Sequence, residues 1–183
     1  CNKAYACLCS SHNRITFHAM NTIVNRSDGK VDLHGLVQAI SQSSAEDSLN
    51  NLLSAEQWDL LSSYLLPVAL PAGQVLFAQG TTDRTLYLLE SGSLSVHFED
   101  EKQRLRLAIV GPGSVVGEGA FFSHLPRSAT VQAGSPCKLW SLPAMRFTEL
   151  SNRQPAVAVH LVMAVGAVLA KRLGSRKRRV AST

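Results

Sequence analysis

The chain has 183 residues, of which 45% are hydrophobic and 17% are charged, a balance typical of a folded globular domain rather than a disordered or fibrous protein. Its formal net charge of +5 is uneven: +3 in residues 1–30, −4 in residues 31–170 and +6 in residues 171–179. Because the middle of the chain is acidic, the charge argues against a nucleic-acid groove in the folded core.

The spacing of the cysteines and the length of the apolar segments indicate where in the cell the protein is expected. Three of the four cysteines lie within the first nine residues, and the fourth is Cys137. This is not the even spacing of a disulfide-stapled secreted domain, and the first twenty residues lack the apolar core of a secretory signal. The longest apolar run, residues 156–170, is interrupted by His160 and is shorter than a membrane span requires. We therefore expect no membrane span and a reducing, cytoplasmic location.

The first thirty residues differ from the remainder of the chain. Residues 1–30 show no sustained periodicity and are rich in Asn, Ser and Cys. Met20 is an alternative start, which would make the preceding nineteen residues a translated leader or an artefact. We expect residues 1–30 to be a disordered or non-native leader and residues 31–183 to hold one domain.

The segment from Val31 to Pro67 carries helical signals. Apolar residues recur from Val31 at mixed spacings of two, three and four, and a serine-rich break at residues 42–44 divides the pattern. Residues 54–57, Ser-Ala-Glu-Gln, have the form of a capping box, which predicts that a helix begins there. Proline disfavours helix in the residue before it, so Pro67 is expected to end this helix. We predict a helical segment over residues 31–66.

After Pro71 the apolar period changes to two, which indicates half-buried strands. The alternating apolar residues are Leu94, Val96 and Phe98, then Leu105, Leu107 and Ile109, then Ala129, Val131 and Ala133. Turn chemistry rich in Gly, Pro and Asp separates these segments. Short strands at such regular spacing are typical of an antiparallel sandwich or jelly roll, which we predict over residues 67–142.

Helical periodicity returns after Pro143, with a long apolar helix predicted from about Pro155 to Leu173. Apolar residues surround nearly all of this helix, so it is either buried or shared with a partner. We predict C-terminal helices over residues 143–175 and a basic tail over residues 176–183. The tail is expected to be solvated, although DNA, anionic lipid or an acidic partner also suits such a run. The predicted fold class is α+β: an antiparallel β-roll (jelly roll) flanked by N-terminal helices and a long C-terminal helix.

The segment most informative about function is residues 117–131, Gly-Glu-Gly-Ala-Phe-Phe-Ser-His-Leu-Pro-Arg-Ser-Ala-Thr-Val. It places one carboxylate, Glu118, nine residues before one guanidinium, Arg127. A carboxylate accepts hydrogen bonds from a ribose hydroxyl, and an arginine fork pairs with two phosphate oxygens at once. The small residues Gly119 and Ala120 leave backbone N–H groups accessible to an anion. These are the groups that a cyclic nucleotide requires.

This segment resembles the phosphate-binding cassette of the cyclic nucleotide-binding domain family. The resemblance runs from about Leu53 to Arg179, and residues 70–80 and 86–92 look like the family's first strands with their glycine turns. Residues 111–118 lead into the cassette as they do in the family. The stretch Pro-Arg-Ser-Ala-Thr-Val is similar to that of the catabolite activator protein and of bacterial cyclic-nucleotide-gated potassium channels.

The resemblance implies specific roles. Arg127 would bind the cyclic phosphate and Glu118 the ribose 2′-hydroxyl, while Ser128 would offer a hydroxyl to the phosphate or the base and favour cyclic AMP over cyclic GMP. The implied ligand-binding residues are Gly117, Glu118, Gly119, Ala120, Arg127, Ser128, Val96, Leu107 and Val110, the last three lining an apolar base pocket. A residue of the last helix is expected to close over the base, and His160, Lys171 and Arg172 are candidates.

Two residues depart from the family pattern. Gly119 stands where relatives usually have Leu, Ile or Met, and His124 stands where many have a small turn residue. These departures leave a second hypothesis open, in which the pocket is vestigial and the fold serves protein interaction through its long helix and tail. A simpler alternative is that Glu118 and Arg127 form only a surface ion pair, which would contribute little to stability.

Other functional classes find less support. Cys1, Cys7, Cys9 and Cys137 raise the hypothesis of an iron–sulfur redox or oxygen sensor, but their spacing does not match that group. Residues 111–117 superficially mimic a dinucleotide loop, yet no βαβ unit surrounds them. No nucleophile elbow, zinc-protease helix or Walker loop occurs, so we expect no enzyme, no metal and no cofactor.

The sequence therefore predicts a cytoplasmic sensor whose ligand is cyclic AMP, with cyclic GMP as an alternative. Movement of the C-terminal helix would carry the signal to an unknown effector protein or to a second subunit in a homodimer. Only four residues follow Arg179, too few for a helix-turn-helix, so no DNA-binding motif is expected in this chain.

Overall fold

The computed structural model describes residues 31–181 except residues 46, 50–52 and 100–104. The predicted leader, Met20 and the three N-terminal cysteines lie outside the described residues. The elements are α1 (His34–Gln42), α2 (Ala55–Ser62), β1 (Leu66–Leu70), β2 (Val75–Phe77), β3 (Leu86–Ser91), β4 (Leu94–Glu99), β5 (Leu105–Val110), β6 (Val115–Val116), α3 (Glu118–Ser123), β7 (Thr130–Ala133), β8 (Cys137–Leu142), α4 (Ala144–Arg153) and α5 (Pro155–Ala181).

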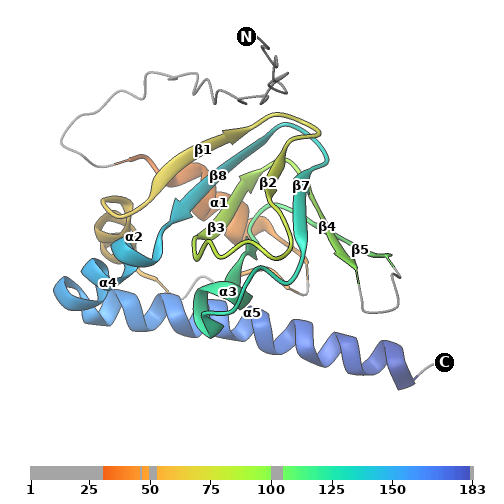
Figure 1. Cartoon of the computed structure of the whole chain (residues 1–183). Helices are drawn as coiled ribbons and strands as arrows, with labels where there is room; N and C mark the ends of the chain where they lie inside the picture. Colours follow the sequence, from red (N-terminus) through yellow and green to blue (C-terminus); the bar gives the residue numbers. More distant parts are fainter. Residues whose placement is uncertain (1–30, 46, 50–52, 100–104, 182–183) are drawn as a thin grey trace, which may run out of the picture.

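The strands form two antiparallel four-stranded sheets, ordered β1-β8-β3-β6 and β2-β7-β4-β5. One apolar cluster, which includes Leu89, Leu94 and Leu139, joins strands of both sheets. A larger cluster lies where the first sheet meets the helices and includes Leu36 and Leu88. Figure 1 shows the β-roll above and α5 running beneath it. The predicted α+β fold with an antiparallel β-roll is confirmed.

The predicted capping box begins α2. The Gln57 N–H donates to Ser54 Oγ at 3.3 Å, and the Ser54 N–H donates to Gln57 Oε1 at 3.1 Å, so two otherwise unpaired donors are satisfied. The helix ends at Ser62, before the expected stop. Pro67 lies instead in β1, an edge strand that pairs only with β8, where a missing N–H is tolerated.

The long helix α5 supplies one side of the larger core. Its buried residues are Val157, Ala158, Leu161, Ala164, Val165 and Val168. Its length and composition, over Pro155–Ser175, would also suit a membrane span, but a third of this stretch is buried inside the domain. The buried face shares a core with α1 and β3, so packing in the domain explains the apolar character of that face.

Two expectations differ from the structure, one about the end of α5 and one about burial in β5. We expected the long helix to end near Leu173 and a solvated tail from residue 176, whereas α5 continues to Ala181. Lys and Arg are good helix formers and favour helix C-termini, so the basic run extends the helix. The alternating residues Leu107 and Ile109 of β5 are 58% and 66% exposed, not buried. Alternation places them on the face of this edge strand opposite to the buried Val110.

Candidate ligand-binding site

A cavity of about 620 Å³ lies between the second sheet, α3 and the C-terminal part of α5. All nine predicted ligand-binding residues line it: Val96, Leu107, Val110, Gly117, Glu118, Gly119, Ala120, Arg127 and Ser128. Lining residues that the sequence did not predict include Asp47, Phe77, Leu169, Leu173 and Ser175. The structure therefore gathers the predicted set in one place, while the binding role of each residue stays a prediction.

The cavity floor depends on Gly117, which precedes α3. Its φ of +88° lies in the left-handed region that favours glycine. A Cβ at this position would overlap Arg127 Nη1 and would lie 2.7 Å from the Thr85 carbonyl oxygen. Glycine is therefore required here both for the turn and for the close approach of Arg127. Glu118, Gly119 and Ala120, whose N–H groups have no intrahelical acceptors, all line the cavity.

Arg127 is 2% exposed and is held from several directions. Nη1 donates to the Gly117 carbonyl at 3.0 Å, and Nη2 donates to the Thr85 carbonyl at 2.7 Å and to the Asp83 carboxylate. The guanidinium also lies 4.0 Å over the ring of Phe77, a cation–π contact. Among the described residues, the buried Nε has no hydrogen-bond partner. An unpaired buried donor is costly, so an acceptor that reached this nitrogen would be stabilising.

Asp83 is the carboxylate that accompanies Arg127. Partial burial opposes its ionisation, but hydrogen bonds from Arg127 and Thr85 and the charge of Arg127 hold the pKa of Asp83 below its ordinary value. The carboxylate is therefore ionised near neutral pH and neutralises the guanidinium. Sequence reasoning missed Asp83, because it lies 44 residues from Arg127 in an irregular segment with no periodic signal.

A second charged cluster lies at the α5 side of the cavity. Arg172 Nη1 donates to Glu118 Oε1 at 2.6 Å, and Nε donates to Asp47 Oδ2 at 2.9 Å. Its Nη2 donates to Ser114 Oγ at 3.0 Å and to the Val115 carbonyl at 2.9 Å. Burial opposes the charged form, but the two carboxylates raise the pKa of Arg172 above its ordinary value. This one side chain joins α5, α3 and the segment before α2.

The partners of Glu118 and Arg127 rule out one alternative. The two residues do not form an ion pair with each other, because Glu118 binds Arg172 and Arg127 binds Asp83. Of the three candidate residues to close over a base, only Arg172 lines the cavity. His160 instead lies near α2, where its Nδ1 is 2.9 Å from Gln57 Nε2.

Much of the remaining cavity lining is apolar. Its lining includes Phe98, Ile109, Leu169 and Leu173 together with the three predicted apolar residues. Leu173 is 54% exposed, so its side chain lies at the open edge of the cavity. One end of the site thus offers an arginine and free backbone donors, and the other offers an apolar surface. This division suits a ligand that has an anionic group and a flat, weakly polar ring.

The departures from the family pattern can now be located. A Cβ on Gly119 would be 4.0 Å from Ser128 Oγ, so the space above this residue is open.

Cys137, one of the cysteines behind the iron–sulfur hypothesis, is buried. Its Sγ donates to the Ser93 and Ser135 carbonyls, and burial raises the pKa of the thiol. In the part of the chain that the structure describes, no cluster of three metal-ligating side chains occurs. A metal centre therefore gains no support from these residues.

Comparisons with known proteins agree with this geometry. Residues 67–154 match the family model described as the cyclic nucleotide-binding domain. The cyclic AMP receptor protein of Thermus thermophilus is 33% identical over 124 residues, covering 66% of this chain and 55% of that protein. A regulatory subunit of cAMP-dependent protein kinase from Yarrowia lipolytica is 37% identical over 79 residues, covering 43% of this chain and 20% of that protein. The chain thus spans only part of either relative.

A solved structure extends the agreement to the whole fold. The cyclic nucleotide-binding domain from Methylobacillus flagellatus superposes with a TM-score of 0.71 at 22% identity, covering 81% of this chain and 83% of that one. At this identity the likeness concerns the fold alone. The matched sequence, the two-sheet roll and the gathered cassette residues together lead to one assignment. The chain belongs to the cyclic nucleotide-binding domain family.

Proposed function

We propose that the cavity binds cyclic AMP in preference to cyclic GMP and that the domain acts as a cytoplasmic sensor. The observation that carries this proposal is the buried guanidinium of Arg127, whose Nε lacks a partner among the described residues. A cyclic phosphate would provide the missing acceptor, and hydrogen bonds from a guanidinium to an anionic oxygen are among the stronger ones. The expected cytoplasmic location stays a prediction from cysteine usage.

The other parts of the nucleotide find matching surfaces. With the phosphate on Arg127, the ribose 2′-hydroxyl would donate to Glu118, the carboxylate on the first turn of α3. The base would extend over Val96 and Val110, whereas Leu107, also a lining residue, lies on the other face of β5. A volume of about 620 Å³ is within the range of sites for ligands of this size. The preference for cyclic AMP rests on the Ser128 hydroxyl and on the resemblance to relatives named for cyclic AMP.

Signalling through α5 is part of the proposal. Glu118 is the acceptor proposed for the ribose, and it already binds Arg172 of α5. Ligand binding would therefore change the electrostatic environment of the residue that ties α5 to the cassette. A ligand shifts such an equilibrium only by its different affinity for the two positions of the helix. The effector that would respond to α5 is unknown.

Calorimetric titration tests the proposal. Cyclic AMP and then cyclic GMP are titrated into protein stripped of carried-over nucleotide. We expect saturable binding, tighter for cyclic AMP, and a loss of at least about 100-fold in affinity in Arg127→Lys, which keeps the charge but loses the planar fork. The matched control is Arg153→Lys, at an exposed arginine paired with Glu149 on α4. Binding by Arg127→Lys equal to that of the control would contradict the proposal.

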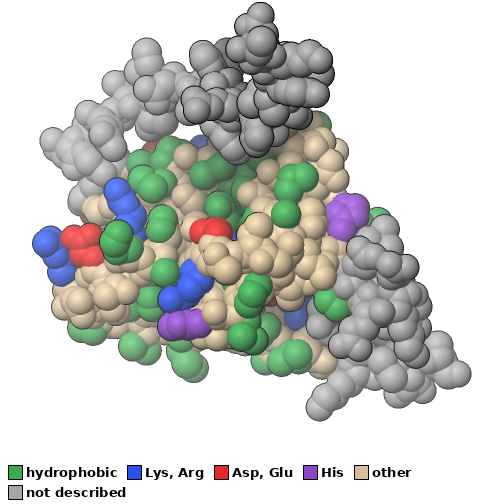
Figure 2. Space-filling model, viewed as in Figure 1, with side chains coloured by type: hydrophobic (Ala, Val, Ile, Leu, Met, Phe, Trp, Pro, Cys, Tyr) green, Lys and Arg blue, Asp and Glu red, His purple; other side chains and the backbone are tan. Residues whose placement is uncertain are grey.

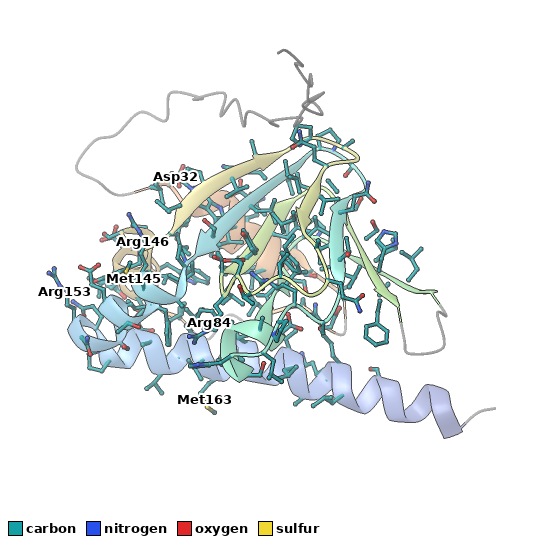
Figure 3. All side chains as sticks on the ribbon, viewed as in Figure 1. Asp32, Arg84, Met145, Arg146, Arg153 and Met163 are labelled. Carbon is teal, nitrogen blue, oxygen red and sulfur yellow. The ribbon has the colours of Figure 1, made fainter. Side chains whose placement is uncertain are left out.

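The exposed side of α5 favours a second candidate function, protein interaction through this helix. Val159 and Met163 are 59% and 63% exposed, and Figure 3 shows Met163 directed away from the β-roll. Figure 2 shows apolar side chains along the lower edge of the molecule, where α5 lies in Figure 1. A second copy of the chain, paired through α5, would cover this surface.

Light scattering coupled to gel filtration tests the pairing. We expect a dimer, which Met163→Glu converts to a monomer because a buried unpaired charge is costly. Met145→Glu is the matched control, since Met145 is 81% exposed on α4 and should leave the dimer intact. Dimerisation without any nucleotide binding would favour the interaction module with a vestigial pocket. A wild-type monomer at all concentrations would exclude the pairing.

A further inference from the structure

His124 is the departure from the family pattern that the proposed function does not use. It ends α3 with a φ of +62°, and it is the only non-glycine residue with positive φ in the part of the chain that the structure describes. Such a conformation is uncommon for a histidine and marks a position worth explaining. The ring reaches Arg84, whose Nη2 lies 2.7 Å from His124 Nε2. Figure 3 shows Arg84 beside α3.

The chemistry of this contact requires an acceptor on the ring. A guanidinium is always charged and only donates, so His124 Nε2 must accept. An imidazole that accepts through Nε2 carries its one proton on Nδ1. A protonated ring has N–H groups on both nitrogens, so it would lose the hydrogen bond and place a second cation beside Arg84. Histidine is the side chain that ordinarily gains its proton between pH 5 and 8.

Arg84 has few other acceptors to compensate. Its Nη2 also lies 3.4 Å from the Phe121 carbonyl oxygen, and its buried Nε has no partner among the described residues. The next residue toward the N-terminus, Asp83, directs its carboxylate to Arg127. Loss of the His124 contact would therefore leave the guanidinium with only the weak bond to Phe121 among these groups.

The other titratable groups on and around α3 have contacts away from the His124 ring. The charged residue of α3 itself, Glu118, lies at the opposite end of the helix on Arg172. On α5, which packs against α3, His160 contacts Gln57 of α2. On β3, Tyr87 is held neutral, since burial raises the pKa of its hydroxyl. Lys171 adjoins Arg172, at the Glu118 end of α3. None of the contacts described for these groups involves the His124 ring.

The contact connects to the ligand site through the turn that carries Arg84. In this turn the Asp83 carboxylate and the Thr85 carbonyl both accept from Arg127. Arg84, between them, ties the same turn to the end of α3. The Arg84–His124 pair therefore joins the turn that orients the phosphate-binding arginine to the helix that carries Glu118.

We propose that His124 is a proton-sensing residue, whose neutral ring holds the turn of Arg84 against α3 and whose protonation weakens cyclic-nucleotide binding. This inference rests on the proposed function, because it concerns the regulation of the same site. The cyclic phosphodiester stays ionised across the relevant range, so the change lies in the protein. Because His124 is exposed, the like-charge repulsion is partly screened, and we expect affinity to fall about threefold between pH 7.5 and pH 5.5.

The test measures cyclic AMP affinity by calorimetry at pH 7.5, 6.5 and 5.5. His124→Gln keeps an acceptor at similar reach without titrating, and its affinity should stay constant. His124→Lys carries a permanent charge, and its affinity should be low at every pH. His160→Gln is the matched control, an exposed histidine away from the cavity, and should retain the wild-type dependence. A dependence in His124→Gln equal to that of wild type, or none in wild type, would overturn the inference.

Failure of the proposed function is distinguishable. If wild type binds no cyclic nucleotide at pH 7.5, the proposed function fails, and the contact is then tested without ligand. The unfolding midpoint of the ligand-free protein should fall more between pH 7.5 and 5.5 in wild type than in His124→Gln. Equal changes in the two proteins would show that the ring does not sense protons through Arg84.

Discussion

The two arginines of the cavity are held in contrasting ways. Arg172 donates to two carboxylates, a hydroxyl and a carbonyl, so every nitrogen of its guanidinium has a partner. Arg127 is more deeply buried, yet it has one carboxylate, two carbonyls and an Nε without a partner among the described residues. Arg172 is therefore satisfied by the protein alone, whereas Arg127 keeps one buried donor that the proposed ligand would satisfy.

The largest effect is expected from Gly117→Ala, which disrupts the packing of Arg127 against the bare backbone of Gly117. The alanine backbone would have to adopt a left-handed φ, and the added methyl group would overlap the guanidinium. Gly117→Ala should therefore lower the free energy of unfolding by about 2–4 kcal/mol. Urea denaturation measures this change. Gly119→Ala is the matched control, because its Cβ meets no atom closer than 4.0 Å. Equal stability of the two variants would show that Arg127 does not depend on the bare backbone at Gly117.

A smaller effect is expected from Glu118→Gln, which tests the ion pair between Glu118 and Arg172. The variant removes one of the two charges that hold Arg172 and weakens the acceptor proposed for the ribose. We expect about a tenfold loss in cyclic AMP affinity, the size of one hydrogen bond to a charged group. Calorimetry with 2′-deoxy cyclic AMP supplies the control: the missing hydroxyl should cost wild type affinity and cost Glu118→Gln much less. Equal losses in both proteins would place the ribose elsewhere.

The same contrast explains what could be predicted from sequence. The cassette was predictable because Gly117, Glu118 and Arg127 lie within one short segment whose spacing reflects a single turn and helix. The alternation over β4 and β7 likewise located the buried residues Leu94, Val131 and Ala133. Local patterns of this kind are preserved in the fold because each strand presents one face to the core.

The partners of the two arginines could not be predicted in this way. Asp83 lies 44 residues before Arg127, and Asp47 lies 125 residues before Arg172, both in irregular segments. Their roles arise from the packing of distant turns, which no periodicity encodes. The exposed Leu107 and Ile109 show the reverse problem, since alternation predicts which residues share a face but not whether that face is buried.

The smallest effect is expected on the stability of the protein at low pH, through the ion pair between Asp83 and Arg127. The pKa of Asp83 is lowered in the folded protein, so its contribution to stability is complete above the ordinary aspartate value near 4 and is lost as pH falls through the lowered value. Urea unfolding between pH 5.5 and pH 3 measures this loss. Other carboxylates titrate in the same window, so the informative quantity is the difference between wild type and Asp83→Asn. We expect wild type to be the more stable at pH 5.5 and the difference to narrow toward pH 3, modestly because the Asp83 side chain is 46% exposed. A difference that stays constant with pH would mean that Asp83 holds Arg127 through hydrogen bonds that the amide replaces, and not through its charge.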